Sequence, residues 1–390
     1  MRESTLEHLT VPGTPPGAPA PQLSLHALAH AGDQVEEGLL VAPNGAWWWI
    51  AGGVPRMLPD SLYRSPELEE KYAEILKKLG LEAPRAVSTT TTLEHRTIDR
   101  FGSEWLMFRD WGWHESPPAG ANPDEYHGGL VANTRAAFRN KTFLEGRLDG
   151  TLALDAGCGN GRFTRAALEC GCREVIAVDL GWGVDACYEH HRHDARVHVV
   201  QASLFDLPVR RVQVAFSIGV LMHTGDARRA MESVAAIVDP GGLIAVRLYH
   251  RGNWAYELTD RAVRGVSTRL SKPAQVALAR RMSGLGRWLI RRDRGQLFGP
   301  RRMRWYQVLR NWPTIHHNLD WWSAPVASHH TAPEVCQWGR ASGLQVLQSD
   351  PPESLPAPGF WTYPEALTVL FERPRNAVAP AVSKPVAVAA

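Results

Sequence analysis

The chain has 390 residues, of which 44% are hydrophobic and 21% charged, as in ordinary globular proteins. It can bury a sizeable core as two or three domains or as one large domain with insertions, which excludes wholesale disorder. No apolar run reaches the roughly 18 residues of a membrane-spanning helix, and Met1–Gln22 lacks the pattern of a secretory signal. The five cysteines follow no zinc-ribbon or disulfide spacing, so we expect a reduced, cytoplasmic protein without a structural metal.

Charge is distributed unevenly, although the net charge is only +3. Between Arg251 and Arg310, fifteen Lys and Arg residues stand against three acids. Such a block indicates an acidic partner, or a face that packs on an acidic domain, although a solvated helical face is the commoner reason for a charge run.

The first part of the chain is predicted to precede the main domain. Residues 1–28 include the stretch VPGTPPGAPAP, which cannot form a helix or a sheet ladder, so we expect a disordered leader. Residues 29–60 are predicted to form short strands around a turn at Asn44 and Gly45. In the linker 61–140, Ser65–Leu79 reads as a helix, and the aromatic segment 101–113 is expected to pack onto another domain.

From Thr151 onward, short apolar runs alternate with helical segments, notably 162–169 and 227–238. This alternation predicts an α/β fold with a Rossmann-like, doubly wound parallel sheet, which binds its ligand at the carboxyl ends of the strands. The expected strands are 152–154, 175–178, 197–200, 212–217 and 243–248, with two late edge strands at 344–348 and 367–372. We expect 141–250 and 333–373 to form this domain, 251–332 to be an inserted basic helical cap, and 374–390 to be a disordered tail.

The strongest chemical signal is the turn after the first strand, Asp155-Ala-Gly-Cys-Gly-Asn-Gly161. Glycines let a backbone approach a ligand closely, but the third glycine comes one residue too early for a dinucleotide fingerprint. Asp155 would repel a diphosphate and suits a cationic amine. Asp179, at the end of the second strand, can accept both hydroxyls of a ribose, although it could also merely cap the following segment. An amine and a ribose without phosphate indicate S-adenosylmethionine.

The sequence at this point resembles the class I S-adenosylmethionine-dependent methyltransferases, through LDAGCGNGRFTRAA, VIAVDL, VQASLFDLPV, FSIGVLMHT and VDPGGLIAVRLY. The resemblance implies that the glycine turn and Asp155 hold the methionine part, that Asp179 binds the ribose, and that Ser203 and Leu204 flank the adenine. The full set of cofactor residues that it implies is Asp155, Gly157, Gly159, Gly161, Asp179, Leu180, Ser203, Leu204 and Ser217. Residues 29–60 resemble a Trm112-like leader that lacks its zinc-binding cysteines.

Two residues are candidates for catalysis, His223 after the fourth strand and Tyr249 after the fifth. A hydroxyl acceptor needs a base, and His223 stands first because it follows the strand beside the expected methyl site, although a lone histidine is more often structural.

Several functions compete. The first is methyl transfer to a small specialised metabolite or sugar-like molecule. The basic block would allow this acceptor to be acidic. The second is RNA methylation, which no recognised RNA-binding module accompanies. A third is transfer or cyclisation of the aminocarboxypropyl chain with release of methylthioadenosine, and a fourth is a regulator that only binds the cofactor. The sequence does not determine the oligomeric state.

Overall fold

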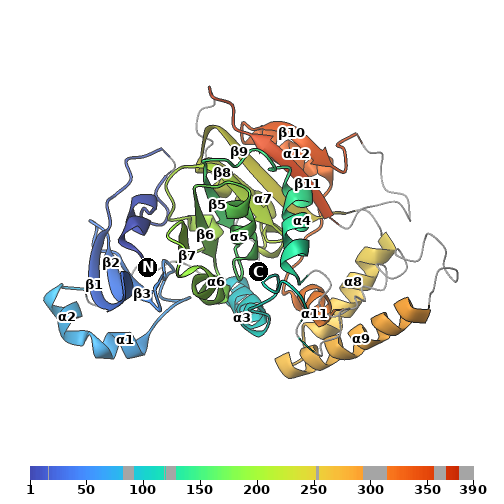
Figure 1. Ribbon diagram of the computed structural model, residues 1–390, viewed down its shortest axis with the longest axis horizontal. Coiled ribbons are helices and arrows are strands. Elements are labelled where there is room, and N and C mark those ends of the chain that lie inside the picture. The colour runs from blue at the N-terminus through green and yellow to red at the C-terminus, as the bar shows by residue number, and fades with distance from the viewer. Residues whose placement is uncertain are drawn as a thin grey trace.

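A computed structural model describes residues 1–15, 17–81, 92–117, 119, 129–251, 254–292, 314–354 and 366–376. Figure 1 shows a central sheet between a small N-terminal sheet with helices α1 and α2 on one side and helices α8, α9 and α11 on the other. Among the helices within those ranges, none combines the length and apolar character that crossing a bilayer requires.

The central sheet has seven strands in the order β10-β11-β9-β8-β5-β6-β7. Strands β5 to β9 are parallel, whereas β11 and β10 are antiparallel to their neighbours. The strands are β5 (Leu152–Ala156), β6 (Glu174–Asp179), β7 (Val197–Gln201), β8 (Val212–Ile218), β9 (Val238–Tyr249), β10 (Gln345–Asp350) and β11 (Ala366–Glu372). The predicted α/β fold is therefore confirmed, and each expected strand overlaps an observed one. Helix α7 is shorter than predicted because β9 already begins at Val238.

Helices cover both faces of the sheet, which explains why its central strands are apolar on both sides. The helices are α4 (Val131–Thr142), α5 (Arg162–Glu169) and α6 (Gly183–His191) on one face, and α7 (Ala227–Ala236) and α12 (Ala332–Ala341) on the other. Two large apolar cores result. The first face buries Phe138 and Phe163 against the sheet, and the second buries Met231 and Trp338.

The N-terminal region forms an antiparallel sheet in the order β1-β2-β3-β4. Its strands are β1 (Ser24–Ala31), β2 (Gln34–Val41), β3 (Trp47–Ala51) and β4 (Val54–Pro55). Gly45 turns between β2 and β3 with a φ of +83°, and the Asn44 side chain accepts a hydrogen bond from the Ala46 N–H. The chain then meets the central sheet, where Arg56 forms an isolated bridge with Gln201 of β7. Likeness to a Trm112-like leader stays a prediction.

The predicted disorder of residues 1–28 is wrong for its described part. A 3₁₀ helix, η1, spans Glu3–His8, and Leu9 is fully buried and forms a bridge with Val209. The prolines after Leu9 do prevent a helix, but they do not prevent an extended chain from packing its apolar residues. Of the predicted disordered tail, residues 377–390 lie outside the described part of the chain.

Helices outside the sheet layers bring further segments to the carboxyl ends of the strands. The predicted helix at 65–79 is divided at Tyr72 into α1 (Pro66–Lys71) and α2 (Ala73–Lys78). Helix α3 (Thr92–Met107) contains the start of the aromatic segment and packs on α6. The region predicted as a cap contains α8 (Trp254–Ser267), α9 (Lys272–Arg292) and α11 (Ile315–Ser323), and α11 packs on the other two. Of the basic block, residues 293–310 fall outside the described ranges.

Candidate active site

A cavity of about 450 Å³ lies at the carboxyl ends of the parallel strands. Its wall includes Gly157 after β5, Asp179 at the end of β6, and Tyr249 at the end of β9. Phe101 of α3 and Trp321 of α11 add aromatic side chains from outside the sheet. Two segments far from the glycine turn in sequence thus complete the site.

The glycine turn connects β5 to α5 and depends on missing side chains. Gly157 has a φ of +96°, and a Cβ there would lie 2.3 Å from a methyl group of Val220. At Gly159, a Cβ would lie 2.7 Å from the Trp105 indole. The turn therefore packs against the chain on both sides, and only residues without a side chain fit there.

Asp179 joins this turn to the loop after β6. Its Oδ2 accepts a hydrogen bond from the Gly159 N–H at 2.9 Å, and its Oδ1 accepts one from the Gly181 N–H at 2.8 Å. Burial raises the pKa of Asp179 although these N–H groups act in the opposite direction. Each carboxylate oxygen can accept more than one hydrogen bond, so Asp179 can still accept hydroxyl groups on the cavity side.

Asp155 and Ser217 do not lie on the cavity wall. Asp155 Oδ2 accepts a hydrogen bond from the Thr164 hydroxyl at 2.7 Å, and burial raises the pKa of Asp155 to about 7. The Ser217 hydroxyl donates to the Ala156 carbonyl at 2.8 Å and links β8 to β5. Both side chains hold the turn in place, and a direct contact between Asp155 and a ligand amine stays a prediction.

The predicted site residues thus fall into two groups. Those on the cavity wall are Gly157, Asp179, Leu180, Ser203, Leu204, His223 and Tyr249. Those behind it are Asp155, Gly159, Gly161 and Ser217. Ser203 has a second role, since its hydroxyl accepts the Phe205 N–H and begins a short 3₁₀ helix, Leu204–Asp206.

Residues 154–246 match the family model described as "Methyltransferase domain". This part of the chain is therefore similar to the methyltransferase domains of that family. The ribosomal protein L11 methyltransferase of Pseudomonas putida (strain GB-1) is 29% identical over 191 residues, which cover 46% of this chain and 64% of that protein. The malonyl-[acyl-carrier protein] O-methyltransferase of Salmonella typhimurium is 32% identical over 140 residues, which cover 34% of this chain and 51% of that protein.

The matches to these relatives thus span between half and two thirds of their length. Among solved structures, the magnesium protoporphyrin IX methyltransferase of Synechocystis with bound S-adenosylhomocysteine aligns with a TM-score of 0.41 and 12% identity, and the match covers 71% of this chain and 97% of that one.

The residues of the cavity fit S-adenosylmethionine, the cofactor that the sequence analysis predicts. S-adenosylmethionine carries a ribose diol, and a half-buried carboxylate, Asp179, stands on the cavity wall where it can accept two hydroxyls. Gly157 presents bare backbone beside it, so the cofactor can approach closely. The volume also lies in the range of pockets that enclose drug-sized ligands, roughly 300 to 1,000 Å³.

His223 lies on a 3₁₀ turn, Leu221–His223, directly after β8. Its Nδ1 is 2.6 Å from the carbonyl oxygen of Val326, which can only accept, so Nδ1 must carry the proton. Burial lowers the pKa of His223 to about 4. At neutral pH the ring is therefore uncharged and Nε2 has a lone pair, which is the state that a general base requires.

Tyr249 lies beside His223, and the two ring centroids are 5.4 Å apart. Trp321 of α11 packs on Tyr249 at 4.8 Å, and Phe101 of α3 packs on His223 at 4.9 Å. The two predicted catalytic residues are thus brought together, and they share one aromatic surface.

The sequence analysis missed a buried group of charged residues beside the cavity. On α3, Arg100 Nη2 lies 3.2 Å from Glu104 Oε2, and His316 Nε2 of α11 lies 3.7 Å from Glu104 Oε1. Burial raises the pKa of Glu104 to about 8 and lowers the pKa of Arg162 to about 10. These residues come from three distant segments, so spacing did not reveal them. The sequence did contain one local signal: Arg100 and Glu104 are four residues apart, which places them on the same face of an aromatic-rich helix.

Proposed function

We propose that this protein transfers the methyl group of S-adenosylmethionine to a small-molecule acceptor, such as a hydroxyl of a specialised metabolite or a sugar-like compound. One observation carries the proposal: the cavity extends from the cofactor residues to an aromatic wall made of Phe101, His223, Tyr249 and Trp321. An acceptor that stacks there would lie beside a neutral histidine.

The shape of this region favours a small acceptor. Helices α3 and α11, which contact each other, supply Phe101 and Trp321 to the wall opposite the sheet. A flat molecule suits such a space because ring faces orient it and exclude water. The wall has three acids, Glu94, Asp179 and Asp320, and three cations, Lys141, Arg162 and Arg247, so its charge does not itself favour an acidic acceptor.

The division of labour follows from these positions. When bound, S-adenosylmethionine supplies an electrophilic methyl carbon. Asp179 holds the hydroxyl groups of the donor, and Gly157 lets the backbone lie close to the donor. Phe101 and Trp321 orient the acceptor. His223 Nε2 takes the proton from the acceptor hydroxyl, and the Val326 carbonyl fixes the ring through Nδ1. Catalysis then depends strongly on orientation, which can supply about 7 to 11 kcal/mol of the barrier to a transfer between two well-placed groups.

Two substitutions of His223 test the base. His223→Ala removes both ring nitrogens, whereas His223→Asn keeps a donor that can reach the Val326 carbonyl. We expect both variants to lose about 100-fold or more of turnover and to retain cofactor affinity, because general bases contribute about 10² to 10⁴ in rate. If His223→Asn retained the wild-type rate, His223 would be an orienting residue and not a base.

The nucleoside product separates methyl transfer from the other chemistry at the same site. Purified protein is incubated with S-adenosylmethionine, with and without a fractionated cell extract, and the products are identified by mass spectrometry. S-adenosylhomocysteine that forms only with an extract fraction is the expected result. Methylthioadenosine formed without an acceptor would replace the proposal by transfer or cyclisation of the aminocarboxypropyl chain.

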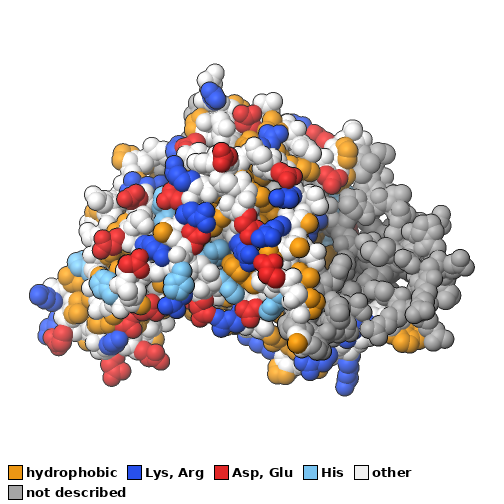
Figure 2. Space-filling view, in the orientation of Figure 1, with side chains coloured by type: hydrophobic (Ala, Val, Ile, Leu, Met, Phe, Trp, Pro, Cys, Tyr) orange, Lys and Arg blue, Asp and Glu red, His pale blue; other side chains and the backbone are white. Residues whose placement is uncertain are grey.

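RNA methylation is the second candidate, and the exposed basic side chains of α8 and α9 favour it. They include Arg261 of α8 and Lys272, Arg280 and Arg281 of α9, with Arg269 in the turn between the two helices. On the face in Figure 2, by contrast, acidic and basic side chains are interspersed over the sheet domain. RNA binding that weakens steeply with salt would support this candidate, whereas retention of small-molecule turnover without RNA would support the first.

The remaining parts of the proposal concern the setting. A cytoplasmic location fits the five free cysteines, since reducing compartments keep thiols unpaired. We further propose that 141–250 with 333–373 is the cofactor-binding unit and that the helices of 251–332 select the acceptor.

A further inference from the structure

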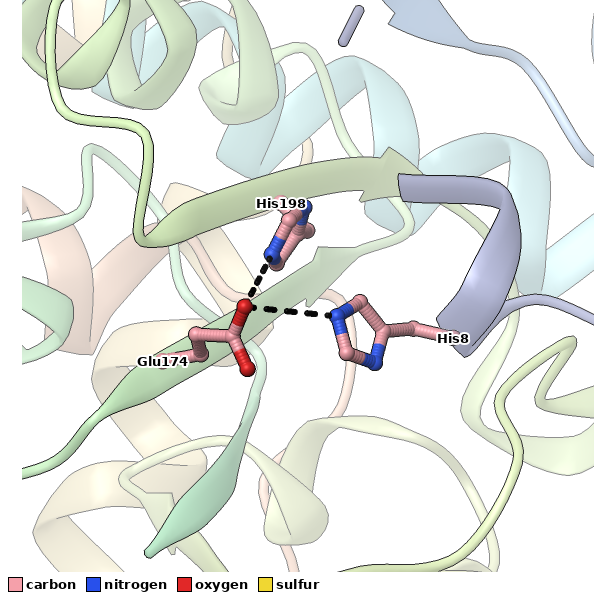
Figure 3. A group of neighbouring side chains, drawn as sticks. All are labelled: His8, Glu174 and His198. Carbon is pink, nitrogen blue, oxygen red and sulfur yellow. Dashed lines mark ion pairs between the residues drawn. The ribbon is translucent and has the colours of Figure 1, made fainter. Parts of the chain in front are cut away.

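Three side chains with metal-binding atoms meet at the end of the sheet opposite the cavity. Figure 3 shows that they come from three elements: His8 from η1, Glu174 from the start of β6, and His198 from β7. Glu174 Oε1 lies 3.8 Å from His8 Nε2 and 3.7 Å from His198 Nε2. One ligand atom from each residue lies within 4.8 Å of the other two.

His198 leaves one ring nitrogen without a hydrogen bond. Its side chain is only 1% exposed, and its Nδ1 lies 3.1 Å from the Thr5 hydroxyl. Its Nε2, which faces Glu174, has no hydrogen-bond partner among the described residues. A buried polar atom without a partner costs about 1 to 3 kcal/mol, so an arrangement of this kind calls for a group that satisfies it.

The other two residues bring a nitrogen and an oxygen atom to the same place. Arg173 Nε donates to Glu174 Oε2 at 3.2 Å, so Oε1 is the oxygen that faces the histidines. Burial, together with the neighbouring His8, lowers the pKa of His198 to about 4, and burial also lowers the pKa of His8. Both rings are then neutral at pH 7. One ring nitrogen of each histidine and one carboxylate oxygen of Glu174 thus lie close together.

We propose that His8, Glu174 and His198 bind one divalent transition-metal ion of the zinc class, with water as the fourth ligand. Zinc takes imidazole nitrogen and carboxylate oxygen at about 2.0 to 2.2 Å, which in a tetrahedron places ligand atoms about 3.3 to 3.6 Å apart. The observed 3.7 and 3.8 Å differ from that spacing by a few tenths of an ångström. The Thr5 hydroxyl orients the His198 ring from the second nitrogen, as outer partners of zinc ligands commonly do.

The donor set also selects the class of metal. Imidazole ligands suit zinc, copper, nickel and iron, whereas magnesium and calcium require mainly oxygen ligands. The guanidinium groups of Arg173 and Arg210 act on His8 against a cation, so we expect a moderate affinity. The sequence prediction of no structural metal considered cysteine spacing, and this site contains no cysteine.

Such an ion would fasten the N-terminal helix η1 to two strands of the central sheet. His8 is the last residue of η1, while Glu174 and His198 belong to neighbouring strands that pair in parallel. The ion would lie away from the cavity, so its effect would be on the stability of the N-terminal segment and not on the reaction.

The test uses the full chain after dialysis against EDTA. Zinc is added in calorimetric titrations, and bound metal is counted by mass spectrometry after desalting. Cobalt serves as a spectroscopic substitute, because tetrahedral Co²⁺ has a characteristic visible absorption. The variants are His8→Ala, Glu174→Gln and His198→Ala. The matched control is His193→Ala, because His193 is an exposed histidine in the turn between α6 and β7, close in sequence to His198.

We expect the wild type and His193→Ala to bind one more zinc equivalent than the three site variants, with at least about tenfold higher affinity, since even an outer partner of a zinc site is worth that much. Zinc should raise the melting temperature of the wild type and leave that of His8→Ala unchanged. If His198→Ala does not fold, His8→Ala and Glu174→Gln still test the site. Equal zinc binding by the wild type and His8→Ala, or equal loss in the control, would overturn the proposal.

Discussion

Replacing Gly157 by Ala should destabilise the protein far more than the same change at an ordinary positive-φ glycine. The φ of +96° alone costs an L-residue about 1 to 2 kcal/mol. The new Cβ would also lie 2.3, 2.4 and 2.8 Å from the three side-chain carbons of Val220. Rotation of Val220 cannot clear all three, so overpacking adds about 1 to 3 kcal/mol. The sum is about 2 to 5 kcal/mol.

The control for this prediction is Gly146→Ala. Gly146 has a φ of +72°, is exposed, and has no atom within 4 Å of a built Cβ, so that variant reports the backbone cost alone. Free energies of unfolding are measured with urea and tryptophan fluorescence, and cofactor affinity by calorimetry. Adding Val220→Ala to Gly157→Ala should restore part of the stability, since it removes the two closest carbons. Equal losses at Gly157 and Gly146 would refute the packing argument.

Two further predictions concern the acids of the site. Burial raises the pKa of Asp155 to about 7, so between about pH 4 and 7 the folded state keeps a proton that the unfolded chain has released, and the free energy of unfolding must fall as pH rises through that window. The side chain of Asp155→Asn has no proton to lose, so the free energy of unfolding of this variant should not fall for that reason. By urea unfolding the variant should be more stable than the wild type by about 1 kcal/mol or more at pH 8 but not at pH 4. The same stability difference between the two proteins at both pH values would contradict the prediction. Asp179→Asn must direct an amide N–H at the Gly159 or Gly181 N–H, because Asp179 accepts from both. We expect it to lose about 1 to 3 kcal/mol of stability and about 10 to 100-fold in calorimetric cofactor affinity, and unchanged binding would exclude Asp179 as a cofactor ligand.

The parts of this fold that the sequence predicted are those with local signals. Helix α5 was expected at 162–169 and spans Arg162–Glu169, because a glycine turn and an apolar strand define its start. The predicted cofactor residues on the cavity wall follow the ends of parallel strands, and such strands end at one edge of the sheet.

The parts that it missed depend on contacts between distant segments. The leader was read as disordered from its prolines, yet Leu9 is buried against the main domain at Val209. Trp105 covers Gly159, although nothing in the spacing of α3 relates the two. Tertiary packing decides such contacts, and local patterns in a single sequence do not reveal which surfaces meet.

The return of the chain at His330 has an evolutionary consequence. The His330 N–H donates to the Tyr249 carbonyl and the Arg251 N–H donates to the His330 carbonyl, so the chain that leaves the sheet after β9 comes back beside the end of that strand. Helices α8, α9 and α11 lie between these two points, whereas α12 and β10 follow them and pack with the sheet. We therefore expect these three helices to lengthen, shrink or be exchanged among descendants while the sheet keeps its geometry. Chimeras joined at Tyr249 and His330 would show whether acceptor selectivity moves with the exchanged helices.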